Sequence, residues 1–393
     1  MTTNYKYYDT ELEQYADLDD KFITDAWLVE RFAGDAVWAW GRSQLGQLGD
    51  GTIVPKSSPV QIGSLTNWKQ VAAAQSGSTV NQGHTVAVKT DGTLWSWGFN
   101  SFGQLGDGTI VRKSSPVQIG SLTNWKQVSA GREFTAAIKT DGSLWTWGYN
   151  LYGQLGSGTI THRSSPVQVG SLTNWKQVSA GSEHTLAIKT DGTIWAWGRN
   201  GFGQLGDGTI NNKSSPVQIG SLTNWKQVDG SNNLSLAIKT DGTLWSWGEG
   251  SNGRLGDGTL ASKSSPVQVG ALTNWKQVSG GENHAAAIKT DGTLWTWGAN
   301  GDGQLGDSTA VSTSSPVWIG TLTNWKQVSA GAKYTAAIKT DGTLWAWGQN
   351  DFGLLGDGTI VVKSSPVQIG QQTNWKQVDV FGHSTAITYR ELS

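Results

Sequence analysis

The chain has 393 residues, no cysteine and a formal net charge of −1. The absence of cysteine excludes disulfides, thiolate metal sites and a cysteine nucleophile, and the near-neutral charge argues against a nucleic-acid partner. No run of about eighteen apolar residues occurs, so we expect no membrane insertion. With 53 glycines and frequent Thr, Ser and Asn, the composition predicts a soluble all-β chain of short strands and tight turns.

Residues 1–36 form a segment of their own, rich in acidic side chains that alternate with apolar ones such as Phe22 and Trp27. This segment is too hydrophobic for a simple disordered tail, so we expect it to dock on a larger assembly. A competing possibility is that residues 26–31 imitate a propeller strand and compete with the C-terminal strand. The first twenty residues lack the pattern of a secretory signal.

From residue 37 onward two motifs recur. Asn-Trp-Lys-Gln-Val and Trp-x-Trp-Gly each occur seven times, and six copies of the latter stand fifty residues apart. Self-similarity at this period indicates a repeat architecture. The tryptophan pairs are Trp38/Trp40, Trp95/Trp97, Trp145/Trp147, Trp195/Trp197, Trp245/Trp247, Trp295/Trp297 and Trp345/Trp347.

One unit, residues 125–169, shows the strands expected in all. Strand A covers residues 126–130, and strand B covers residues 134–139 and ends in an Asp-Gly hairpin signal. Strand C carries the two tryptophans on one face, because side chains alternate along a strand. A long loop then leads to strand D, whose proline suits a sheet edge. Four antiparallel strands per unit, repeated in a ring, predict a β-propeller.

The repeat count also predicts how the ring closes. Residues 37–393 hold seven units and one insertion, residues 76–82, so the chain ends where the first strand C begins. Strands A and B near residues 375–390 should therefore complete the blade opened by strands C and D near residues 37–62. We predict an all-β, seven-bladed β-propeller of four-stranded antiparallel blades, clasped by N- and C-terminal strands that leave no free sheet edge.

Three repeated sequences are similar to those of a known family. Gly-x-x-His-Thr-x-Ala-Ile-Lys-Thr-Asp-Gly, Leu-Trp-x-Trp-Gly-x-Asn and Gly-Gln-Leu-Gly-Asp-Gly-Thr resemble the repeats of the regulator of chromosome condensation, in a style close to near-identical-repeat members from marine bacteria and phages. The resemblance implies a seven-bladed propeller. It does not fix a function, because the family includes a nucleotide exchange factor, a plant photoreceptor and a secreted β-lactamase inhibitor.

The repeats differ from one another mainly in the A–B connections and the C–D loops. In an up-and-down blade these connections share one end, so we expect one variable and one nearly constant face. Aromatic and arginine residues are enriched in binding hot spots, and loops on a rigid scaffold commonly carry recognition. Neutral drift of unconstrained loops is the competing explanation. The predicted contacts with a protein or glycan partner are Phe99, Phe102, Arg132, Glu133, Phe134, Tyr149, Tyr152, Glu183, His184, Arg199, Phe202, Asn233, Glu282, His284, Lys333, Tyr334 and Phe352.

Trp318 is a further candidate contact at the rim. It stands on strand D where the other repeats have glutamine, for example Gln218 and Gln268. We expect it to face solvent, because that strand position is polar in those repeats.

Catalytic and metal sites are not predicted. His84, His184 and His284 share one repeat position, but non-adjacent blades should not bring them to one metal, so we expect hydrogen-bonded histidines instead. The variable acids, such as Glu133, come with no nucleophile, oxyanion donors or cofactor motif. We therefore expect no catalytic residue, no metal, no cofactor and no enzymatic activity.

These patterns predict a recognition module. We expect attachment through residues 1–36 and binding through the variable face, in a virion (phage tail or fibre type) or at a cell surface. The alternative is an intracellular protein-binding regulator of exchange-factor or inhibitor type. The acidic segment argues against this alternative, because the chromatin-binding members of the family carry a basic tail. Virion or cytoplasm is the expected location.

Overall fold

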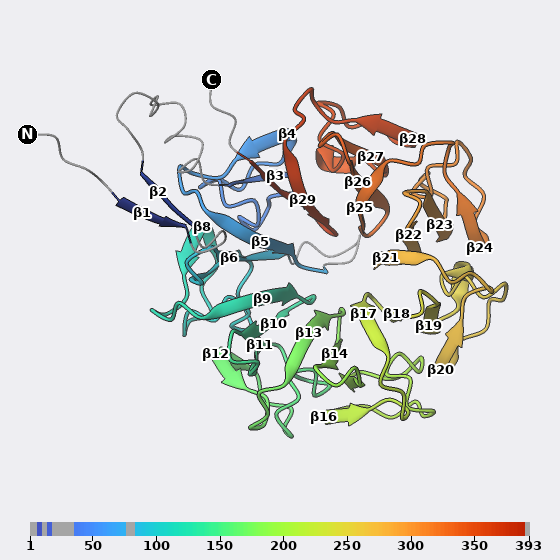
Figure 1. Cartoon of the computed structure of the whole chain (residues 1–393), viewed down its shortest axis with the longest axis horizontal. Coiled ribbons are helices and arrows are strands. Elements are labelled where there is room, and N and C mark those ends of the chain that lie inside the picture. The colour runs from blue at the N-terminus through green and yellow to red at the C-terminus, as the bar shows by residue number, and fades with distance from the viewer. Residues whose placement is uncertain (1–5, 10–13, 18–34, 76–82, 390–393) are drawn as a thin grey trace, which may run out of the picture.

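The computed structural model describes residues 6–9, 14–17, 35–75 and 83–389. Seven four-stranded antiparallel sheets surround a central channel, and strand A of each sheet lies innermost (Figure 1). The predicted seven-bladed propeller is confirmed. Only two short 3-10 helices occur in the described residues, η1 (Ser251–Gly253) and η2 (Asp351–Gly353), and neither approaches the length or apolarity needed to cross a bilayer.

We number the blades from the first one built from consecutive strands. Blade 1 comprises β5 (Trp68–Ala73), β6 (His84–Lys89), β7 (Leu94–Gly98) and β8 (Lys113–Gln118). Blade 2 comprises β9 (Trp125–Ala130), β10 (Phe134–Lys139), β11 (Leu144–Gly148) and β12 (Arg163–Gln168). Blade 3 comprises β13 (Trp175–Ala180), β14 (His184–Lys189), β15 (Ile194–Gly198) and β16 (Lys213–Gln218).

The next three blades repeat this order. Blade 4 comprises β17 (Trp225–Gly230), β18 (Leu234–Lys239), β19 (Leu244–Gly248) and β20 (Lys263–Gln268). Blade 5 comprises β21 (Trp275–Gly280), β22 (His284–Lys289), β23 (Leu294–Gly298) and β24 (Thr313–Trp318). Blade 6 comprises β25 (Trp325–Ala330), β26 (Tyr334–Lys339), β27 (Leu344–Gly348) and β28 (Lys363–Gln368).

Blade 7 joins the two ends of the chain. Its strands are β29 (Trp375–Val380), β30 (Ser384–Thr388), β3 (Ala36–Gly41) and β4 (Lys56–Gln61), and the red and blue ribbons lie side by side in Figure 1. The register pairs Val37 with Ile387 and Trp40 with Ser384. The predicted clasp is therefore confirmed.

The N-terminal segment contributes one described hairpin outside the ring. Strands β1 (Lys6–Asp9) and β2 (Gln14–Asp17) pair antiparallel. Residues 26–31, proposed above as a competing strand, and the insertion at residues 76–82 lie outside the described residues.

The Asp-Gly hairpins are fixed by their own side chains. In blade 2 the Oδ1 atom of Asp141 accepts hydrogen bonds from the backbone N–H and the hydroxyl of Ser143, at 2.8 and 2.6 Å. The Ser143 oxygen in turn accepts the indole N–H of Trp145 at 2.9 Å. Gly142 has φ of +80°, and a Cβ there would lie 2.1 Å from the carbonyl oxygen of Thr173. Only glycine fits this turn, because the next blade's link packs directly on it.

The core lies between blades and is built on the repeated tryptophans. Trp147 is fully buried, and Trp125 contacts both Trp145 and Trp147 edge-on at about 6 Å between ring centroids. The ammonium of Lys139 covers the half-buried Trp145 at 3.7 Å. Edge-to-face packing and a cation above an indole both stabilise such a cluster beyond its apolar area.

A ring of glutamines lines the channel and links every blade to the next. In blade 2 the amide of Gln127 donates to the carbonyl of Val178 at 3.0 Å and accepts the N–H of the same valine at 3.2 Å. The last link, from Gln377 to the carbonyl of Val71, measures 2.8 Å. The seven donors are Gln70, Gln127, Gln177, Gln227, Gln277, Gln327 and Gln377.

Candidate partner-binding site

The A–B connections and C–D loops meet on one face of the disc. Glu183, in the A–B connection of blade 3, pairs with Arg199 of the C–D loop in the same blade at 2.5 Å. It also lies 3.7 Å from Arg132, in the A–B connection of blade 2. These contacts place residues of both variable loops next to each other, so they form one continuous surface, which we call the variable face.

Aromatic side chains form a connected group on this face across blades 1 and 2. Phe102 contacts Phe99 at 6.4 Å and Tyr149 at 4.9 Å between ring centroids. Tyr149 in turn contacts Tyr152 at 6.4 Å and stacks on His162 at 4.9 Å with an interplanar angle of 23°. We call these five residues the aromatic strip.

The strip ends at a cluster of charges on blades 2 and 3. The Arg199 guanidinium lies 5.2 Å from the ring centroid of Tyr152, and Glu183 is held between Arg199 and Arg132. Burial raises the pKa of Glu133, and the charge of Glu183 adds to this effect while Arg132 opposes it. Burial likewise raises the pKa of the Tyr149 hydroxyl, so that the phenol stays neutral at physiological pH.

His162 was not among the predicted contacts, although several repeats have a polar side chain at its position. The Nδ1 atom of His162 accepts the backbone N–H of Asn150 at 2.9 Å. Blades 3 and 5 use Asn212 and Ser312 for the same bond. This position supplies a hydrogen-bond acceptor to the C–D loop in four blades, and in blade 2 the acceptor is the ring of a histidine.

Five predicted contact residues are buried: Glu133 keeps 8% exposure at the edge of the face, whereas the other four are wrongly assigned to the variable surface. Phe134, His184, His284 and Tyr334 are all fully buried. They begin strand B, where the side chain points between blades rather than into the preceding loop. A partner on the surface cannot reach these side chains.

The buried polar side chains at this position tie each blade to the next. The Nε2 atom of His184 lies 3.0 Å from the hydroxyl of Ser235, which itself donates to a backbone carbonyl, so the imidazole is the donor. The phenol of Tyr334 is 2.9 Å from the hydroxyl of Ser384. Burial lowers the pKa of His184 to about 3, which keeps the ring neutral.

The remaining predicted contacts on blades 4 to 6 form separate polar pairs. Asn233 donates to Glu249 at 3.0 Å, and Lys333 pairs with Asp302 at 3.4 Å. The backbone carbonyl of Glu282 accepts a hydrogen bond from Arg254, which also pairs with Glu249. Arg254 is almost fully buried. It could have been noticed in the sequence, because Gly-Arg-Leu stands in blade 4 where most repeats have Gly-Gln-Leu.

Two further aromatic side chains stand alone on the same face. Phe202 is 37% exposed, and Phe352 is 38% exposed beneath the guanidinium of Arg42 at 4.6 Å. Neither has a ring contact with the aromatic strip among the described residues. Trp318, on the outer strand of blade 5, is 44% exposed and stacks on Trp295 with an angle of 16°.

Two aspartates with raised pKa values, Asp229 and Asp379, line the central channel. Asp229 and Asp379 each accept a backbone N–H, from Gly280 at 2.7 Å and from Ala73 at 2.8 Å. Burial raises the pKa of each to about 7. Within the described part of the chain, no group of three or more His, Cys, Asp or Glu side chains is arranged to hold a metal ion.

Comparison with known proteins places these features in a family. The model of the regulator of chromosome condensation (RCC1) repeat matches residues 35–80, 91–138, 141–188, 191–238, 241–288, 291–338 and 341–386. A second model of the same repeat matches residues 125–154, 175–204, 275–304 and 325–354.

Curated relatives match only part of their own length. The ultraviolet-B receptor UVR8 of Arabidopsis thaliana is 35% identical over 106 residues, which is 26% of this chain and 23% of the receptor. Human alsin is 32% identical over 103 residues, 25% of this chain and 6% of alsin. The chain thus spans less than a quarter of the curated relatives it matches.

Solved structures match over almost the whole ring. Human WBSCR16 superposes with a TM-score of 0.80 at 22% identity, covering 91% of this chain and 100% of that one. Yeast RCC1 superposes with a TM-score of 0.81 at 21% identity, covering 92% and 90%. At this identity the likeness concerns the fold alone. Because the repeat model matches all seven units, the chain belongs to the regulator of chromosome condensation (RCC1) repeat family.

Proposed function

We propose that this protein is a non-enzymatic recognition module that binds a protein partner through the aromatic strip of the variable face. The observation that carries the proposal is the concentration of connected aromatic rings on blades 1 and 2, next to the Arg132–Glu183–Arg199 cluster. Blades 4 to 6 hold polar pairs and an isolated ring instead.

The strip suits a binding surface because its rings are pre-positioned. Tyr149 is stacked on His162 and flanked by Phe102 and Tyr152, so little side-chain freedom remains to be lost on binding. Rigid aromatic rings with adjacent arginines dominate the energy of protein interfaces. The blade strands beneath the loops supply the stiffness.

The strip also lies outside the tryptophan core between the sheets. Phe102 and Tyr152 belong to the C–D loops and are partly exposed, whereas the core tryptophans lie between the sheets. Aromatic area that lies outside the core and stays in contact with water is typical of an interaction surface.

We place the attachment function in the N-terminal segment. Residues 1–36 would dock the propeller on a larger assembly, in a virion or at a cell surface, while the variable face stays free. The second candidate is an intracellular protein-binding regulator, which the membership of the repeat family favours. Cell fractionation with an antibody against the propeller distinguishes the two. An attachment module would be found in purified particles or at the cell surface, and an intracellular regulator would be found in the cytosol.

The central test compares two rings at equivalent repeat positions. Phe102→Ala and Phe352→Ala remove the same side chain from the same repeat position in two C–D loops, and circular dichroism checks that both variants fold, because of the two only Phe352 has a left-handed φ, of +64°. Wild-type and variant propellers are immobilised, and proteins captured from the source organism are identified and quantified. We expect capture to be lost in Phe102→Ala and kept in Phe352→Ala. Equal capture by both variants, or capture of glycans alone, would refute the proposal.

A further inference from the structure

Most blades contain an ion pair between an aspartate of the C–D loop and a lysine of strand D, and blade 5 lacks it. In five blades a lysine at the start of strand D pairs with the Oδ2 atom of the aspartate in the Gly-Asp-Gly-Thr loop, at 3.3 to 3.7 Å. The pairs are Asp50–Lys56, Asp107–Lys113, Asp207–Lys213, Asp257–Lys263 and Asp357–Lys363.

Blade 5 keeps the carboxylate and lacks the cation. Thr313 stands where the lysine would be, and its hydroxyl donates to the carbonyl of Ser315. The Oδ1 atom of Asp307 accepts the same hydrogen bonds as in other blades, from Asn300 at 3.0 Å and from Thr309 at 2.8 and 2.9 Å. No lysine or arginine of the described residues forms an ion pair with Asp307.

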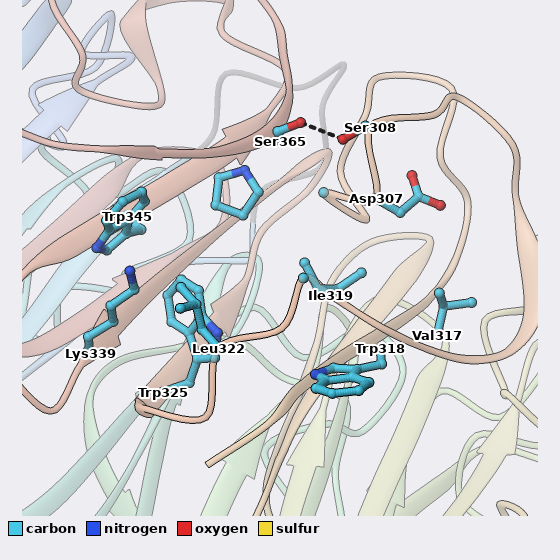
Figure 2. Close-up of a pocket in the computed structure, with 13 residues that line it drawn as sticks. Asp307, Ser308, Val317, Trp318, Ile319, Leu322, Trp325, Lys339, Trp345 and Ser365 are labelled. Carbon is cyan, nitrogen blue, oxygen red and sulfur yellow. Dashed lines mark hydrogen bonds between the residues drawn. The ribbon is translucent and has the colours of Figure 1, made fainter.

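This carboxylate lines a cavity of about 640 Å³ between blades 5 and 6. Figure 2 shows Trp325, Trp345 and Leu322 on one side of the cavity and Asp307 and Ser308 on the other. The cavity therefore has an apolar wall opposite a carboxylate. That combination complements the alkyl stem and ammonium of a lysine.

The polar wall carries a second departure from the repeat. Ser308 replaces the glycine of the other Gly-Asp-Gly-Thr loops and keeps a left-handed φ of +67°, which a non-glycine residue seldom adopts. Its hydroxyl lies 2.8 Å from that of Ser365 on blade 6. Two hydroxyls that can accept hydrogen bonds are thus held beside the carboxylate.

The matched groove between blades 3 and 4 shows what such a carboxylate accepts. That cavity has about 570 Å³ and is lined by Asp207, Trp225, Trp245 and the chain's own Lys213. Lys339 also lines the blade 5–6 groove, but its ammonium lies 3.6 Å from the ring centroid of Trp345, on the wall opposite Asp307 (Figure 2).

We propose that the groove between blades 5 and 6 binds a lysine side chain of a protein partner, whose ammonium takes the place that Lys213 occupies in the matched groove. Asp307 Oδ2 receives the ammonium, and the alkyl stem lies along Leu322 and Trp325. The groove lies on blades remote from the aromatic strip, so this inference does not depend on the proposed function.

The test uses a synthetic peptide of defined sequence, acetyl-Ala-Leu-Lys-Leu-Ala-amide, and a control peptide with methionine in place of lysine. Binding to the full chain is followed by calorimetry up to about 10 mM peptide, since a single side chain gives weak affinity. We expect the lysine peptide to bind and the methionine peptide to bind at least about tenfold more weakly.

Two variants and a matched control make the test specific. Thr313→Lys restores the sequence of five other blades, so it should fold normally, supply its own ammonium and reduce peptide affinity at least about tenfold. Asp307→Asn should do the same and keep the bonds to Asn300 and Thr309. Asp207→Asn, in the matched groove, should leave affinity unchanged. Equal binding of the two peptides, unchanged affinity in Thr313→Lys, or binding of methyl mannoside but not of the lysine peptide would each overturn the proposal.

Discussion

The indole N–H of Trp147 donates to the backbone carbonyl of Gln104, 43 residues earlier and in the preceding blade, at 2.9 Å. The same bond joins Trp197 to Gln154 and Trp347 to Gln304. Trp147 thus fills the space between two sheets and also satisfies a buried acceptor of its neighbour. The second tryptophan of the pair is a blade-to-blade connector in six of the seven repeats, Trp97 being the exception, whereas the first, such as Trp145, bonds to the hairpin of its own blade.

Trp147→Phe should destabilise the protein by about 2–3 kcal/mol, because it creates a cavity and removes one of the two hydrogen bonds to the Gln104 carbonyl, which keeps the one from the Thr135 hydroxyl. Trp145→Phe is the matched control, since Trp145 is half-buried and its N–H bonds only to Ser143. We expect a loss of about 1 kcal/mol there. Urea denaturation followed by circular dichroism measures both. Equal losses would show that the inter-blade bond and the burial of Trp147 add nothing.

The clasp in blade 7 should carry much of the stability of the ring. Deleting residues 384–393 removes β30, which pairs with both β29 and β3. The remaining strands would expose unpaired backbone groups on either side of the gap. We expect a sharply lower melting temperature and a loss of the single cooperative transition.

A smaller change in the same blade provides the control for the clasp. Thr388→Val removes the hydroxyl that accepts the N–H of Trp38 at 2.8 Å but keeps the strand. Its cost should be near 1 kcal/mol. A deletion variant that melts like Thr388→Val would contradict the clasp as a source of stability.

The fold could be predicted because every repeat position meets nearly the same neighbours seven times. The fifty-residue period located the strands, and the position of Val37 relative to the C-terminus predicted its pairing with β30. Such regularity is a property of the chain itself, so no knowledge of distant contacts was needed.

The binding surface was predicted less well, for a physical reason. Phe134 and Tyr152 are both aromatic and both lie in variable stretches, yet the first is buried and the second is partly exposed. The difference depends on whether a residue ends a loop or begins strand B, and on the direction of its side chain between blades. A boundary error of one residue therefore moves a side chain from surface to core.

Tyr334→Phe should test this correction directly. The change removes the hydroxyl near Ser384, while Ser384 keeps its bond to the carbonyl of Leu354. We expect a loss of stability of about 1 kcal/mol and unchanged partner capture. Tyr152→Ala should behave in the opposite way, with an intact fold and lost capture. The outcome that contradicts the assignment is loss of capture in Tyr334→Phe with an unaltered melting temperature.

The buried histidines and the channel aspartates change the free energy of unfolding in opposite directions as the pH rises. The pKa values of His84, His184, His284 and His383 are lowered to about 3 by burial, and the charge of His383 lowers that of His84 further. Between about pH 3 and 6.5 the unfolded chain binds protons that the native histidines refuse, so stability rises with pH.

The two channel aspartates make the protein less stable as the pH rises. Burial raises the pKa of Asp229 and Asp379 to about 7, and the charge of Asp379 raises that of Asp229 further. Hydrogen bonds from Gly280 and Ser179 to Asp229 oppose the increase. Between about pH 4 and 7 the native carboxyls hold protons that the unfolded chain has released, so their contribution falls as pH rises.

The four histidines outnumber the two aspartates, so we expect the free energy of unfolding to increase from pH 4.5 to pH 6.5. Asp229→Asn removes one opposing contribution, because an amide does not titrate, and should make this increase steeper. His184→Gln removes one of the groups that drive it and should make the increase shallower. Each unit of pKa displacement corresponds to about 1.4 kcal/mol, so the two slopes should be separable by urea denaturation at three pH values. A slope that Asp229→Asn leaves unchanged would mean that the channel carboxyls are ionised in the native state, with water entering the channel to solvate them.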